Sequence, residues 1–307
     1  MQGENIIFVV KKGDGVQQIG ANLLSAKLIN SELFFSIYSK KSNLSTKFQA
    51  GEYELSSKMS IVEIADILAN GKVVRKEKDI KLIEGWTTRE MDAYLVKLNL
   101  IKEGDLLNYS KNEISNLKNN YSFLNELPKN ATLEGFLFPD TYRIYENAKL
   151  DSIVKKMLGN FDSKLTDEMK TDIKKQGKSL YEIITMASLI EKEVKSYDDK
   201  RMVSGIFWNR IKNGQALESC ATLAFVLGVN KKQYTYEDTR IDSPYNSYMN
   251  RGLPPGPISN PSLNAIKAAI YPIDNDYVYF LSRFDNGETV FSKTYDEHLR
   301  NKAKYLK

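Results

Sequence analysis

The sequence has almost no cysteine and almost no histidine, the side chains that bind zinc and, in the case of cysteine, form disulfides. Its 307 residues include one cysteine, Cys220, and one histidine, His298. A single cysteine excludes an internal disulfide, and one cysteine with one histidine argues against a zinc site. No serine or cysteine motif pairs with His298 to suggest a catalytic triad, and a lone histidine in a helix is usually a packing or surface residue. We therefore expect neither a metal nor a cofactor.

Long apolar runs, glycine-rich phosphate loops and basic clusters are also missing. No run approaches the roughly 18 to 20 apolar residues of a membrane-spanning helix, so we expect the chain as given to be soluble. Lys and Arg number 44 against 39 acids, a net charge of +5, and the charges are interspersed. A nucleic-acid-binding module would need clustered Arg and Lys with exposed aromatics, so no nucleic-acid partner is expected. Of the chemistries considered, acid–base catalysis by carboxyl groups is the one that these absences leave open.

The best placed carboxyl group lies near the end of a predicted helix over residues 179–195. Ser179 and Glu182 form a capping box that predicts where this helix begins. Helical periodicity places Glu191 on its apolar stripe and Glu193 on roughly the opposite side. A carboxyl group on an apolar stripe loses hydration, which raises its pKa and suits a general acid. From the helix alone, the favoured interpretation is that Glu191 lies at the edge of the stripe and pairs with a lysine.

Local signals predict the other elements. Capping boxes at Ser60/Glu63, Thr87/Glu90 and Thr294/Glu297 predict three more helix starts. Asn260 before Pro261 predicts a helix to Ile270. Asp198 or Asp199 is expected to cap the helix that follows the 179–195 helix and ends at Asn213-Gly214. Two strands with a turn at 285–287 predict a hairpin over 277–293.

Two segments combine aromatic rings with polar groups. Residues 132–143 contain Glu134 and Asp140, and the stiff, proline-rich loop at 242–261 contains Tyr245, Asn246 and Tyr248. Ring faces with hydrogen-bonding groups suit a sugar site. The first segment also reads as a buried loop with satisfied acids, and the second as a structural wrap around the core.

Seven motifs occur in one order along the chain. They are Glu-Gly-Phe-Leu-Phe-Pro-Asp-Thr-Tyr (134–142), Ala-Ser-Leu-Ile-Glu-Lys-Glu (187–193), Asn-Arg (209–210), Leu-Glu-Ser-Cys-Ala-Thr (217–222), Asp-Ser-Pro-Tyr-Asn-Ser-Tyr (242–248), Gly-Leu-Pro-Pro-Gly-Pro-Ile-Ser-Asn-Pro (252–261) and Phe-Ser-Lys-Thr-Tyr-Asp-Glu-His (291–298). Together they resemble the MltG (YceG-like) endolytic murein transglycosylases over nearly the whole chain.

This resemblance implies an α+β fold in two parts. A small LysM-like α/β module is expected over residues 1–78, followed by a larger mixed α/β catalytic domain over 79–307. Within that domain, 79–130 would be a linking subdomain and 131–307 the catalytic core, which ends in a β-hairpin and a helix.

The resemblance also implies a lyase that cuts the MurNAc–GlcNAc β-1,4 bond of nascent peptidoglycan strands and leaves a 1,6-anhydroMurNAc end, which would terminate strand elongation. Glu191 is the implied single catalytic residue, first as acid and then as base. The implied substrate-binding residues are Glu134, Asp140, Tyr142, Arg210, Glu218, Ser219, Thr222, Tyr245, Asn246, Tyr248 and Pro254.

The chain resembles family members that are anchored by one N-terminal membrane helix, with the catalytic part on the cell-wall side of the membrane. That helix is not in this sequence and is expected in the full-length protein. Cell-wall synthases or divisome proteins are the implied protein partners. Where some members have Gln-Ser/Thr-Asp, this chain has Glu218-Ser219-Cys220, which leaves the role of position 220 open. A non-catalytic peptidoglycan-binding protein and a muramidase-type hydrolase are the alternative functions.

Overall fold

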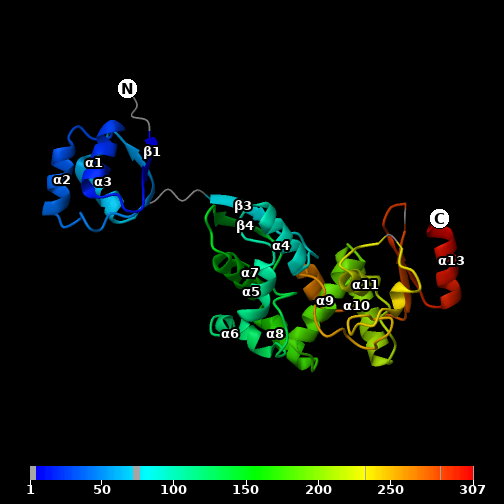
Figure 1. Ribbon diagram of the computed structural model, residues 1–307. Helices are drawn as coiled ribbons and strands as arrows, with labels where there is room; N and C mark the ends of the chain where they lie inside the picture. Colours follow the sequence, from blue (N-terminus) through cyan, green and yellow to red (C-terminus); the bar gives the residue numbers. More distant parts are fainter. Residues whose placement is uncertain (1–4, 72–76, 232, 284, 307) are drawn as a thin grey trace. The chain divides into compact units, whose positions relative to one another are not determined.

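The chain folds into two compact units, Met1–Lys78 and Asp79–Lys307, each with its own core. The computed structural model in Figure 1 describes residues 5–71, 77–231, 233–283 and 285–306. Each sheet of the described residues has two strands, and helices form most of the regular secondary structure of the larger unit. The predicted α+β class is confirmed.

The first unit packs three helices against one face of a two-stranded antiparallel sheet. Strand β1 (Asn5–Val10) pairs with β2 (Gly51–Ser56), with Phe8 opposite Tyr53. The helices are α1 (Val16–Ser25), α2 (Glu32–Lys41) and α3 (Ile61–Ala69). Alternation along the strands turns Phe8, Val10, Tyr53 and Leu55 into the core. The LysM-like character of this unit stays a prediction.

The second unit begins with a strand pair and a helical layer. Strand β3 (Glu77–Lys81) pairs with β4 (Thr141–Tyr145). Around them lie α4 (Thr88–Lys97), α5 (Asp105–Asn112), α6 (Ile114–Leu117), η1 (Ser122–Glu126), α7 (Leu150–Lys164) and α8 (Asp167–Lys175).

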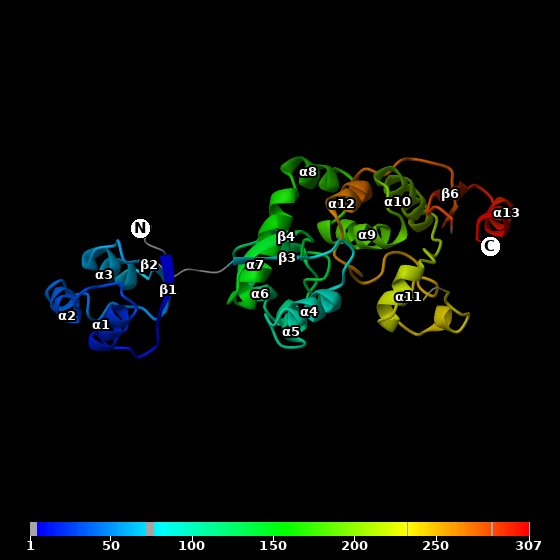
Figure 2. The same ribbon diagram turned by 90° about the horizontal axis from the view of Figure 1, so that it is seen from above.

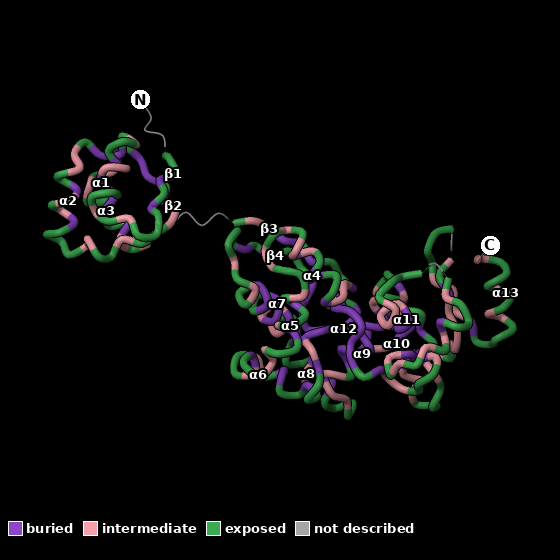
Figure 3. The backbone as a smooth tube through the Cα atoms, in the orientation of Figure 1, coloured by how far each residue is buried: buried purple, intermediate pink, exposed green. Residues whose placement is uncertain are grey.

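Helix α9 (Leu180–Glu193) is the centre of this unit, because every residue from Ile183 to Ile190 is buried. It packs against α10 (Tyr197–Lys212), α11 (Cys220–Leu227) and α12 (Leu263–Ile270). Figure 2 shows α12 beside α9 and α10, and Figure 3 shows α9 and α12 among the most buried segments. A short η2 (Asp238–Arg240) lies between α11 and α12 in the chain.

Local capping signals are confirmed at three helices and corrected at others. Complete capping boxes form at Ser60, Thr87 and Ser179. The predictions that Asn260 caps α12 and that an aspartate caps α10 are wrong, because Ser262 and Ser196 hold those positions. Tertiary contacts take the side chain of Asn260 away from the helix that follows it.

The C-terminal hairpin and helix are confirmed. Strands β5 (Tyr279–Ser282) and β6 (Thr289–Ser292) pair antiparallel, and α13 (Tyr295–Tyr305) follows. Thr294 accepts a hydrogen bond from Glu297 N, but the Glu297 carboxylate binds Lys293 N at 2.8 Å, so the predicted capping box is only half formed. Within the described residues, no helix has the length and apolar character needed to cross a bilayer.

Candidate functional site

Two carboxyl groups two residues apart end helix α9, and they have different surroundings. Glu193 is the last helical residue, and Val194 follows with an extended backbone at φ −144° and ψ 159°. Residues two apart on a helix point about 200° apart, so Glu191 and Glu193 face opposite sides. The sequence pattern predicts this separation, and the structure shows what each side meets.

Glu191 meets a buried cation. Its Oε1 accepts a hydrogen bond from Lys200 Nζ at 2.8 Å, and the two side chains are 8% and 5% exposed. Its Oε2 accepts from both the backbone N–H of Ser262, at 3.0 Å, and the Ser262 hydroxyl. This carboxylate therefore links α9 to α10 and to the start of α12. Its contact with Lys200 agrees with the interpretation from the sequence that Glu191 pairs with a lysine.

Glu193 meets a cavity. Among the described residues its carboxyl group has one hydrogen-bond donor, the Ser219 hydroxyl, and no lysine or arginine nitrogen within 4 Å. Burial raises the pKa of Glu193, and the Ser219 hydrogen bond and the charge of Arg210 oppose that rise. Burial thus shifts the protonation equilibrium of this carboxyl group toward the protonated form.

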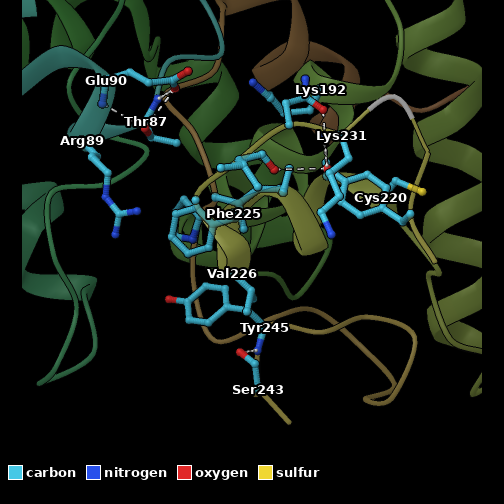
Figure 4. A pocket seen from close by; sticks show the side chains of 18 of the residues that line it. Thr87, Arg89, Glu90, Lys192, Cys220, Phe225, Val226, Lys231, Ser243 and Tyr245 are labelled. Atoms are coloured by element: carbon cyan, nitrogen blue, oxygen red, sulfur yellow. Dashed lines mark hydrogen bonds between the residues drawn. The ribbon is translucent and has the colours of Figure 1, made fainter. Parts of the chain in front are cut away.

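The cavity beside Glu193 has a volume of about 1240 Å³ and lies entirely in the second unit. Figure 4 shows Thr87, Arg89 and Glu90 on one side of it and Lys192, Cys220 and Lys231 on the other. Aromatic rings contribute flat apolar surface. Those of Phe225 and Tyr245 lie 5.0 Å apart, and Tyr234 and Tyr248 also line the cavity.

A smaller compartment of about 380 Å³ shares Glu193, Cys220 and Tyr248 with this cavity. Arg210, Glu218 and Ser219 line it. Glu218 has φ of +52°, in the left-handed region that non-glycine residues rarely adopt. Strained backbone of this kind is often found next to functional groups, and here it directly precedes the serine that binds Glu193.

Glu134 is a buried acid in the wall of the larger cavity. Both of its oxygens accept from Thr88 N at 3.0 Å, and Oε1 accepts from Asn260 Nδ2 at 2.9 Å. Burial raises the pKa of Glu134 to about 7, although the bonds from Thr88 lower it. Its neighbour Gly135 has φ of +89°, and a Cβ there would lie 2.6 Å from Pro257, so glycine permits this close approach.

Asn260 links these segments. Its Oδ1 accepts from Gly135 N at 2.9 Å and Leu137 N at 3.0 Å, and its Nδ2 donates to Trp86 O at 3.0 Å as well as to Glu134. This buried amide joins the loop after β3, the 134–142 motif and the proline-rich loop. The wall around Glu134 is therefore held by hydrogen bonds between residues distant in the sequence.

The predicted substrate-binding residues divide into two groups. Those that line one or both compartments are Glu134, Arg210, Glu218, Ser219, Tyr245 and Tyr248. Those outside both linings are Asp140, Tyr142, Thr222, Asn246 and Pro254, together with the predicted catalytic residue Glu191.

The residues outside the linings make structural contacts. Tyr142 donates to Phe138 O at 2.6 Å, and Asp140 accepts from Asn160 Nδ2 at 2.9 Å. The fully buried Asn246 donates to Thr239 O and to Ile241 O, and so fixes the loop that carries Tyr245 and Tyr248. Thr222 and Pro254 are also buried. Of the five, Asn246 has a direct structural link to the cavity wall, through the loop that it fixes.

Sequence reasoning missed several lining residues. Phe225, Tyr234 and Lys231 lie in or after α11, which reads in sequence only as an apolar helix and a polar loop. Lys302, near the C-terminus, lines both compartments. Of the lining residues that were missed, Glu193 is the one for which the sequence contained a signal, because it belongs to the same Glu-Lys-Glu motif as Glu191.

The fold and the site define a class of protein. It is an α+β protein with a desolvated carboxyl group in an aromatic-lined cleft, which suits acid–base chemistry on a polar ligand with flat ring faces. The model of the YceG-like family matches residues 8–304, and the chain belongs to that family.

Named relatives and a solved structure agree with this membership. The endolytic murein transglycosylase of Bacillus subtilis is 33% identical in an alignment 313 residues long that covers 97% of this chain and 84% of that protein. The protein of the same name from Streptococcus pneumoniae strain D39 is 31% identical over 97% of this chain, and the match spans 58% of its length. A YceG-like protein of Listeria monocytogenes, solved at 2.6 Å, is 32% identical with a TM-score of 0.67, covering 97% of this chain and 99% of that one.

Proposed function

We propose that this protein is an endolytic lytic transglycosylase of peptidoglycan, acting on the cell-wall side of the membrane. Family membership and the named relatives support the substrate class. The observation that carries the chemistry is the desolvated carboxyl group of Glu193 at the junction of two compartments. Termination of strand growth, a membrane anchor and contacts with synthases or divisome proteins stay predictions.

Glu193 is the residue we assign as acid and base, in place of Glu191. A general acid must reach the leaving oxygen, and Glu193 lines the cleft while both oxygens of Glu191 are bound by Lys200 and Ser262. A general acid must also be protonated, and burial favours that form at Glu193. Glu191 then has a positioning role, because it fixes the end of α9 that carries Glu193.

The reaction needs one carboxyl group used twice. Protonated Glu193 donates to the glycosidic oxygen between MurNAc and GlcNAc, and the positive charge that develops at C1 is stabilised by the sugar's own N-acetyl group. The carboxylate then accepts the proton of the muramoyl O6 hydroxyl as that oxygen closes on C1. The bond to GlcNAc breaks, the 1,6-anhydro bond forms, Glu193 recovers its proton, and no water is consumed.

The test compares Glu193→Gln with Glu191→Gln on purified peptidoglycan, with anhydromuramoyl products measured by mass spectrometry. We expect Glu193→Gln to lose at least about 100-fold in rate, because a positioned acid contributes that much or more. Glu191→Gln should retain activity below its melting temperature. An active Glu193→Gln, or a folded but inactive Glu191→Gln, would return the role to Glu191.

The same digest separates the alternative functions. Products with reducing ends would indicate a muramidase, which adds water instead of closing the O6 ring. Binding of wild type to peptidoglycan without any cleavage would indicate a binding protein only.

A further inference from the structure

The smaller compartment has polar groups that the proposed reaction does not use. It lies between α10, the β5–β6 hairpin and α13, and three nitrogen-bearing side chains line it: Arg210, His298 and Lys302. Arg210 comes from α10, and the other two come from successive turns of α13. His298 belongs to the seventh motif of the sequence, which the acid chemistry leaves without a role.

Arg210 is a buried cation without a paired anion. Its guanidinium donates to Leu217 O at 2.7 Å and to Val278 O at 2.8 Å, and the residue is 9% exposed. No carboxylate in the described part of the chain lies within 4 Å of its nitrogens. Buried charges are normally paired at close range, whereas Glu218 and Glu193 act on this guanidinium only from beyond 4 Å.

His298 and Lys302 add unpartnered polar atoms to the same wall. The His298 ring stacks on Tyr279 at 5.2 Å, and its Nδ1 is buried with no hydrogen-bond partner among the described residues. Lys302 is exposed, and no carboxylate of a described residue lies within 4 Å of its ammonium group. Buried polar atoms are nearly always hydrogen-bonded, so His298 Nδ1 is one unmet hydrogen bond in the wall of this compartment.

The acids of this compartment do not cancel its positive charge. Glu218 and Glu193 line it with the cations. In the form of the enzyme that donates a proton, Glu193 is neutral. Glu218 is then the one negative charge among the described residues of the lining, and Arg210 and Lys302 are two positive charges. An anionic group in the compartment would therefore gain net attraction and fill the hydrogen bonds now unmade.

We propose that the smaller compartment binds a carboxylate of the peptide carried by a muramoyl unit of the substrate strand. This inference rests on the proposed function, because it names a further part of the same substrate. A strand cut in its interior has no chain-end phosphate nearby, whereas each unprocessed muramoyl unit carries a peptide with carboxylates. A volume of about 380 Å³ exceeds that of a carboxylate alone and leaves room for part of the peptide.

The experiment uses Lys302→Met with Lys304→Met as the matched control. Both lysines are exposed on α13, but Lys304 lies against Tyr305 and lines neither compartment. Anhydromuramoyl release is measured on strands with intact peptides and on strands stripped of peptide by an amidase. For Lys302→Met we expect KM to rise about threefold to tenfold on intact strands and clearly less on stripped strands, because Lys302 also lines the larger cavity.

Two results would overturn the inference: an equal rise in KM on both kinds of strand, or a rise of the same size in Lys304→Met. His298→Asn should reproduce the selective rise, since asparagine cannot stack on Tyr279 and bind the peptide as histidine does. If wild type releases no anhydromuramoyl product from either strand, the proposed function fails. Calorimetric binding of a soluble muramoyl peptide to wild type and Lys302→Met then still decides the inference.

Discussion

Replacing Lys200 with methionine should unfold the second unit at a much lower temperature while leaving its chemistry in place. The Lys200–Glu191 pair is almost fully buried, so the change leaves a carboxylate without its cation. Removing one partner of a buried pair costs about 3–5 kcal/mol, and the two remaining bonds from Ser262 place this case at about 3 kcal/mol. For a unit of this size, that is a fall in Tm of about 6–12 °C.

Differential scanning calorimetry of Lys200→Met measures the fall, with the exposed Lys195→Met as control. In the double variant with Glu191→Gln the loss should be smaller than in Lys200→Met, because the uncompensated charge is gone. Anhydromuramoyl release well below Tm should persist. A Tm within about 2 °C of wild type, or loss of activity in a folded Lys200→Met, would refute the view that this pair is an anchor.

The remaining predictions concern titration and the buried amide. Ser219→Ala removes the bond that lowers the pKa of Glu193, so the alkaline limb of the pH–rate profile should move to higher pH; an unmoved limb argues against Glu193 as the acid. Glu134 has its pKa raised to about 7, so its stabilising contribution is full below about pH 4.5 and is lost as pH rises through 7. Wild type should therefore lose about 3 kcal/mol more than Glu134→Gln over that window in urea titrations, and parallel curves would contradict this. Asn260→Ala leaves several buried groups unpaired and should cost at least about 3 kcal/mol of unfolding free energy, measured the same way; a loss under about 1 kcal/mol would contradict the linking role.

Local signals in the sequence predicted local structure well. The capping boxes at Ser60, Thr87 and Ser179 depend on side chains three residues apart, so the sequence contains everything that forms them. The hairpin before α13 is likewise encoded by two strands and their turn. The order of seven motifs identified the family, which the comparisons confirmed.

Long-range partners decided what the sequence could not. Asn260 has the residue type and spacing of an N-cap, but its amide is used by Gly135 and Leu137, more than 120 positions away. The apolar stripe correctly places Glu191 on the buried face of α9, but periodicity contains no information about Lys200 and Ser262. Which of two nearby acids faces a cavity depends on segments that the pattern of one helix does not contain.

The position of Glu193 at the last residue of α9 has an electrostatic consequence of its own. The carbonyl dipoles of a helix sum to a partial negative charge at its C-terminal end, which disfavours a carboxylate there. Burial is the main cause of the raised pKa of Glu193, and the helix end acts in the same direction. Glu191 holds the end of α9 in place through Lys200 and Ser262. The fixed helix end would therefore help to keep Glu193 protonated between turnovers.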